Sequence, residues 1–146
     1  CALPISMWIF TETGFVSAVQ SSKDSETMSV RARDKQSLVS IAEVTGQPIL
    51  RSPEGDYPYR VFVSKVEFAQ WAFEQAMNID YRNFKNRVFE TRGYEYAHEL
   101  GRVWSVMLAT EDADSRSGST GDLVDPAQTM SDSAQKMSDP ADTVEA

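Results

Sequence analysis

The stretch that decides the fold is DYPYRVFVSKVEFAQWAFEQAMNIDYRNFKNRV, from Asp56 to Val88. In its first part, YRVFV at residues 59–63, Tyr59, Val61 and Val63 alternate with Arg60 and Phe62. Successive side chains of a strand point to opposite faces, so the alternation predicts a strand that turns Arg60 and Phe62 to one face and apolar residues to the other. The rest of the stretch predicts helices that follow this strand closely.

A helix is expected to begin directly after that strand. Ser64 and Glu67 have the spacing of a capping box, in which each side chain accepts a hydrogen bond from the backbone of the other residue. Such a cap contributes about 1 kcal/mol. Phe68, Trp71 and Ile79 then recur at helical spacing, which predicts an aromatic-rich stripe packed on the sheet.

The end of the stretch, residues 81–88, predicts a second short helix, with Asp80 as its cap. Its aromatic and basic residues could contact bases and phosphates. Its helical spacing also fits an ordinary amphipathic helix, in which the aromatic side chains enter the core and the charged side faces solvent. The polar candidates for a binding site in this segment are Arg82, Asn83, Lys85, Asn86 and Arg87.

Other strands are expected on both sides of this stretch. Residues 7–10 and 15–20 are rich in β-branched or aromatic residues, residues 27–33 alternate cleanly, and residues 48–52 are expected to form a weaker strand. The alternation turns Arg31 and Arg33 to one face. A helix is expected between Asp34 and Gly46, and a last helix over residues 94–110, with Ala97, Leu100, Trp104, Met107 and Leu108 as its apolar face.

These elements occur in the order β-β-β-α-β-β-α-α-α. We therefore predict an α+β fold: a mostly antiparallel sheet of about five strands, with helices packed on one face. Residues 7–112 are expected to form a single globular domain. Residues 1–6, CALPIS, resemble the translation of a sequencing adapter, so we expect a non-native or disordered leader, with the natural start at Met7. Residues 113–146 lack aromatic side chains and are expected to be a disordered acidic tail.

Composition and charge exclude some classes of protein. The net charge is −8, and the tail contributes −5 of it through seven acidic and two basic residues, so the domain is close to neutral. Cys1 is the only cysteine and His98 the only histidine, which excludes a disulfide framework and a zinc site built from several of these residues. We find no signal peptide and no apolar run of membrane-spanning length, and we expect a soluble, cytoplasmic protein.

Five motifs of the chain are similar to those of a family of short, uncharacterised bacterial and phage proteins. They are MWIFTETGFVSAVQ (Met7–Gln20), VRAR (Val30–Arg33), DYPYRVFVS (Asp56–Ser64), IDYRNFKNRV (Ile79–Val88) and YAHELGRVWSVM (Tyr96–Met107). The resemblance extends from Met7 to Met107 and does not include the tail. The family has no assigned activity, so the resemblance implies a natural start and a domain limit but no chemistry.

The open face of the sheet is the second candidate surface. Arg31, Arg33, Arg60 and Phe62 are expected on it, where they could bind an anion, an acidic partner or RNA. Arginines also occur on open sheets simply to prevent edge-to-edge aggregation. The leading hypothesis is a non-enzymatic module that binds a protein partner or has an accessory role, and the alternative is a nucleic-acid-binding module that uses these arginines and aromatic residues.

A third hypothesis is an enzyme that uses His98 with Glu95 or Glu99 for general acid–base catalysis. One histidine on a helix is more typical of a surface residue. The sequence contains no phosphate-binding loop, nucleophile elbow or zinc-protease motif. We therefore predict no catalytic residue, no metal, no cofactor and no membrane association.

Overall fold

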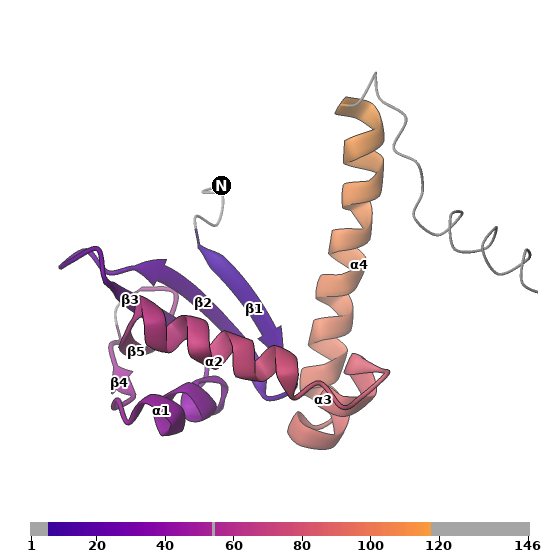
Figure 1. Cartoon of the computed structure of the whole chain (residues 1–146). Helices are drawn as coiled ribbons and strands as arrows, with labels where there is room; N and C mark the ends of the chain where they lie inside the picture. Colours follow the sequence, from indigo (N-terminus) through magenta and orange to yellow (C-terminus); the bar gives the residue numbers. More distant parts are fainter. Residues whose placement is uncertain (1–5, 54, 118–146) are drawn as a thin grey trace, which may run out of the picture. The chain divides into compact units, whose positions relative to one another are not determined.

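A computed structural model of the chain describes residues 6–53 and 55–117. The chain divides into two compact units, and the division follows Ser105. The first unit contains the sheet and all helices up to the first half of the last one (Figure 1). Of the predicted leader, residues 1–5 lie outside the described residues, and so do residues 118–146 of the predicted tail.

The first unit contains one antiparallel sheet with strand order β1-β2-β3-β5-β4. The strands are β1 (Met7–Thr11), β2 (Gly14–Gln20), β3 (Thr27–Ala32), β4 (Leu50–Arg51) and β5 (Tyr59–Ser64). The first three form successive hairpins, and the chain then makes an excursion before β5 pairs with β3. The predicted α+β class and antiparallel sheet are confirmed, although β4 is shorter than the expected strand at residues 48–52.

The helices are η1 (Gln36–Leu38, a 3-10 turn), α1 (Val39–Thr45), α2 (Lys65–Met77), α3 (Phe84–Arg92) and α4 (Tyr94–Ser117). The helix expected after Asp34 therefore starts as a 3-10 turn, and the Asp34 carboxylate accepts a hydrogen bond from the Ser37 amide at 3.0 Å. It ends as predicted at Gly46, which has a left-handed conformation.

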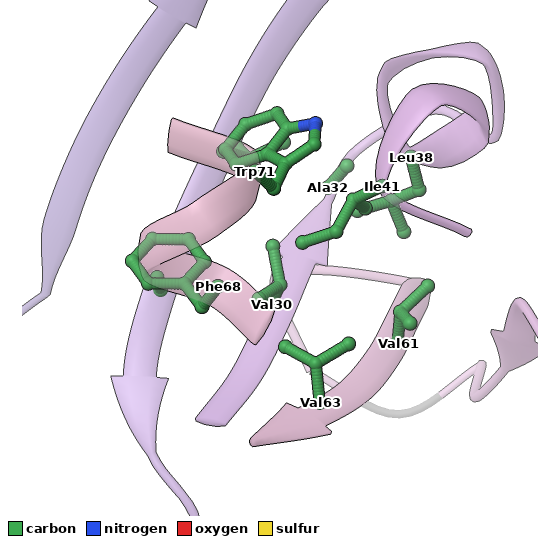
Figure 2. Close-up of a cluster of buried hydrophobic side chains, with 10 residues drawn as sticks. Val30, Ala32, Leu38, Ile41, Val61, Val63, Phe68 and Trp71 are labelled. Atoms are coloured by element: carbon green, nitrogen blue, oxygen red, sulfur yellow. The ribbon is translucent and has the colours of Figure 1, made fainter. Parts of the chain in front are cut away.

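The core lies between the sheet and the helices η1, α1 and α2. Trp71 and Phe68 of α2 lie over Val30 and Val63, and Trp71 is fully buried (Figure 2). The indole Nε1 of Trp71 donates to Ser40 Oγ at 3.0 Å, so its one polar atom is satisfied. Tight packing on this side of the sheet leaves the side chains on the opposite side as candidates for function.

The start of α2 agrees with the prediction. The Ser64 side chain accepts from the Glu67 amide at 3.1 Å, and the Glu67 carboxylate accepts from the Ser64 amide at 2.7 Å. Both bonds of the capping box are present. Because each satisfies a backbone donor that the first turn leaves without a partner, the strand-to-helix corner is well defined.

Two details beyond this helix were predicted wrongly. Ile79 is 56% exposed and is not a core residue, because α2 ends at Met77 and the stripe does not continue past it. The cap of α3 is Asn83 rather than Asp80: its side chain accepts from the Asn86 amide at 3.1 Å. The helix therefore starts later than the sequence pattern indicates.

Helix α3 is tied to the β1–β2 turn. Arg87 forms an ion pair with Glu12, and the Thr91 hydroxyl donates to the Glu12 carbonyl. Arg92 pairs with Asp34 at 3.0 Å and stacks on the Tyr96 ring. These contacts connect the end of the sheet to the α3–α4 corner through side chains far apart in the sequence.

The apolar face predicted for the last helix is only partly buried. Within the first unit, Ala97 is buried but Trp104 is 66% exposed. In the second unit, Met107 and Leu108 are also exposed. Helix α4 continues beyond the predicted end at residue 110 to Ser117, so the start of the predicted acidic tail is helical.

The glycine that starts β2 is expected to be irreplaceable. Gly14 has φ +155°, and an alanine Cβ there would lie 2.1 Å from Ser37 Oγ and 2.8 Å from an Arg92 Nη atom. We predict that Gly14→Ala lowers the free energy of unfolding by about 3 kcal/mol, measured by urea denaturation. The matched control is Gly101→Ala in α4, where the new Cβ meets nothing within 4 Å. It should stabilise the protein slightly, and equal effects of the two substitutions would contradict the assigned packing.

Candidate functional site

The open face of the sheet carries a row of three polar residues from neighbouring strands. The register places Ser17 of β2 opposite Arg31 of β3, and Arg31 opposite Arg60 of β5. Directly opposed side chains in an antiparallel pair lie on the same face, about 5 Å apart at Cβ. The two arginines are therefore immediate neighbours, on the face away from Trp71 and the core.

Hydrogen bonds from each guanidinium hold this row in place. Arg31 Nη2 donates to Ser17 Oγ at 3.1 Å, and Ser17 is fully buried. Arg60 Nη2 donates to the Tyr57 carbonyl at 3.5 Å, which is a long and weak contact. The Nε atoms of Arg31 and Arg60 are both buried, and neither has an acceptor among the described residues. Such a donor costs about 1–3 kcal/mol, so the row is not optimised for stability.

Tyr57 lies between two of the guanidinium groups. The guanidinium carbons of Arg31 and Arg33 each lie 4.9 Å from the centroid of its ring. Arg33 Nη1 also donates to the Asp56 carbonyl at 3.1 Å. Stacking on an aromatic face orients a planar guanidinium without neutralising its charge. We call Arg31, Arg33, Arg60 and Tyr57 the arginine cluster.

The arginine cluster carries three positive charges and contains no acidic residue. Among the described residues, none of its three arginines forms an ion pair with a carboxylate. Like charges directly opposite each other in a sheet are destabilising. A surface that holds three cations together, two of them partly buried and none with a counter-ion in the described chain, attracts anionic groups. Because guanidinium matches oxyanions in geometry, the cluster can bind carboxylate or phosphate.

Aromatic residues occupy the remainder of the open face. Phe62 is opposite Ser29, and the Lys23 ammonium lies 5.7 Å from the Phe62 ring centroid. On β1 and β2, Phe15 stacks on Phe10 at 4.8 Å and contacts Trp8 edge-on at 5.4 Å. Trp8 is 45% exposed. The β3–β5 half of the face thus carries the arginines together with Phe62, and the β1–β2 half carries the other aromatic rings.

Of the binding-site candidates in and just before α3, some stabilise the fold and others are exposed. Asn83 caps the helix, and Arg87 is half-buried in an ion pair with Glu12. The hydrogen bond that Arg87 donates to the Glu12 carboxylate raises the pKa of Arg87 above its ordinary value. Arg82, Lys85 and Asn86 are exposed, and no interaction within the described chain joins them to the arginine cluster.

Sequence reasoning brought Arg31, Arg33, Arg60 and Phe62 to one face, and the structure places them there. It missed Tyr57, which lies in the turn before β5, where no periodic pattern assigns a direction to a side chain. The role of Tyr57 is evident only from the folded structure, because its ring contacts arginines that are 24 and 26 positions away in the chain.

The histidine candidate lies apart from this face. His98 is on the exposed side of α4, with Nδ1 3.7 Å from a Glu99 carboxylate oxygen and its ring stacked on Tyr94. Glu99 also pairs with Arg102 at 3.0 Å. These neighbours all belong to the same helix, as is typical of a surface network.

The comparisons with known proteins give no functional information: no protein-family model, curated protein or solved structure matches this chain. The resemblance to the bacterial and phage family therefore rests on the sequence motifs alone. In the described part of the chain, no helix is long and apolar enough to cross a membrane. Within the same residues, no group of three or more His, Cys, Asp or Glu side chains is placed to hold a metal ion.

We predict that Arg60→Met raises the free energy of unfolding by about 1 kcal/mol, because it removes a buried donor without an acceptor and a like-charge neighbour. Urea denaturation of the full chain measures this change. The matched control is Arg51→Met, on the adjacent strand β4, where the arginine is exposed. It should change stability little. A clear loss of stability in Arg60→Met would show that Arg60 stabilises the fold and would contradict this prediction.

Proposed function

We propose that the protein is a non-enzymatic binding module and that the open face of the sheet is its working surface. The observation that supports the proposal is the pairing of Arg31 with Arg60 across β3 and β5, with Arg33 beside them on Tyr57. An arrangement that lowers stability in the free protein is typical of a site that is completed by a ligand. A cytoplasmic location, expected from the sequence, remains part of this proposal.

A protein partner with acidic groups fits this surface best. The arginines of the face would pair with its anionic groups, and the β1–β2 half, where Trp8 is exposed, would bury against its apolar side chains. Arginine and aromatic residues are enriched where binding energy concentrates in protein interfaces. The near-neutral domain suits a local contact of this kind better than a long polyanion.

A nucleic-acid partner is the second candidate, and one observation favours it. Trp8, Phe10 and Phe15 form an aromatic group on the same face as the arginines. Exposed rings next to basic residues can stack on the bases of a single strand while arginines contact its phosphates. Its binding would weaken steeply with salt.

The His98 hypothesis remains a third class, and the neighbours of His98 among the described residues, Tyr94 and Glu99, both belong to its own helix. The hypothesis predicts that His98→Ala abolishes whatever activity is detected. A detected activity that survives this substitution would remove it.

The binding surface can be tested by capturing partners from a native lysate on the immobilised full chain. We expect a specific partner that the wild type captures and that Arg31→Gln/Arg60→Gln loses at least about tenfold. The matched control is Arg82→Gln/Lys85→Gln, which removes the same charge from exposed positions just before and within α3 and should capture normally.

Nuclease treatment of the lysate separates the two kinds of partner. Capture that survives the treatment indicates a protein, and capture that disappears indicates nucleic acid. A partner that binds all variants equally would contradict the proposed surface.

A further inference from the structure

The arginine cluster is more specific than a general basic surface. Two guanidinium groups, of Arg31 and Arg33, lie against one tyrosine ring, and Arg31 is also paired directly with Arg60 on the neighbouring strand. We infer that this cluster is a receptor for a phosphomonoester group, carried by the protein partner of the proposed function. The inference rests on that function and specifies the chemistry that the partner must present.

The charge of the cluster matches a dianion better than a monoanion. Within the described residues, the three arginines have no carboxylate partner. A phosphomonoester carries about −1.5 to −2 at neutral pH, whereas a carboxylate carries one charge. A single carboxylate would leave Arg31 and Arg60 with one positive charge that is not compensated. A dianion between them neutralises both.

The donors of the cluster also match phosphate. Arg31 uses one Nη to hold Ser17, and Arg60 has one weak contact to a carbonyl, so each guanidinium keeps further N–H groups for a ligand. A phosphomonoester presents three acceptor oxygens, enough to bridge two or three forks at once. A carboxylate presents two, which match a single guanidinium fork. Arg33, which is exposed, can supply the outer contact.

The surroundings of the cluster prepare it for this ligand. Tyr57 holds Arg31 and Arg33 by stacking, and Ser17 fixes the Arg31 fork from the β2 side. Both Nε atoms are already shielded from solvent. Ordering the side chains before binding lowers the entropy cost that flexible surface arginines would incur. A backbone phosphodiester, with one charge and fewer free oxygens, uses this arrangement less well.

The test compares small probes on the full chain labelled with ¹⁵N, with binding followed through the arginine Nε–Hε resonances. The probes are N-acetyl-phosphoserine amide, N-acetyl-glutamate amide, inorganic phosphate and a uridine oligonucleotide without terminal phosphate. We expect phosphoserine amide to bind at least about tenfold more tightly than glutamate amide and to shift the Arg31 and Arg60 signals. Inorganic phosphate should shift the same signals.

The pH dependence gives an independent readout. The second ionisation of a phosphomonoester lies near pH 6, while arginine stays charged throughout. Affinity for phosphoserine amide should therefore rise several-fold between about pH 5.5 and about pH 7.5. A flat profile, or equal affinity for glutamate amide, would overturn the inference. Tight binding of the oligonucleotide with none of phosphoserine amide would also overturn it and would favour a nucleic-acid partner.

Variants make the result specific. Arg31→Gln/Arg60→Gln should lose phosphate binding, whereas Arg82→Gln/Lys85→Gln should keep it. Arg31→Lys/Arg60→Lys keeps the charge but removes the forked donors, so it should weaken binding even where the fold is unchanged. If lysine restores full affinity, the forks are not used and the inference is wrong.

The failure of this inference can be told apart from failure of the function. If phosphate does not bind but the Arg31→Gln/Arg60→Gln variant still loses its captured partner, the surface is correct and the phosphomonoester is not. If phosphate binds but capture is unaffected by the variant, the receptor is present and the proposed partner surface is wrong.

Discussion

The pairing of β3 with β5 is the constraint on which the arrangement of this protein depends. Val30 is paired with Val61, and both are fully buried in the core that also contains Trp71. Because side chains alternate along a strand, the register that buries these valines also brings Arg31 opposite Arg60 on the other face. A shift by one residue would bury arginines in the core, so the like-charge pair follows from the core packing.

The structure reduces the cost of this pair without removing it. Tyr57 stacks on Arg31, and Ser17 accepts one of its hydrogen bonds. Neither contact brings a negative charge, and two guanidinium Nε atoms remain buried without an acceptor in the described chain. Elsewhere the same protein does neutralise its arginines: Arg87 is paired with Glu12, and Arg92 with Asp34. The contrast between the two sets of arginines is the main physical argument that the open face is a binding surface.

The accuracy of sequence reasoning depended on how local each feature is. The capping box at Ser64 and the alternation of residues 59–63 involve neighbours within a few positions, and both were predicted correctly. The Arg87–Glu12 ion pair joins residues 75 positions apart, and no pattern in either segment predicts it. The exposure of Ile79 follows from where α2 stops, and a periodic pattern alone does not show that end. For the candidate site, alternation gave the correct face for each arginine, but the register that makes Arg31 and Arg60 neighbours comes from long-range pairing.

The central claim is that Arg31 and Arg60 repel each other in the free protein and are joined by an anion. A double-mutant cycle with Arg31→Met and Arg60→Met, followed by urea denaturation with and without inorganic phosphate, measures this coupling directly. The account predicts a repulsive coupling of about 0.5 kcal/mol or more without phosphate. It also predicts that the coupling becomes attractive when phosphate is added. An attractive or zero coupling without phosphate, unchanged by its addition, would contradict it.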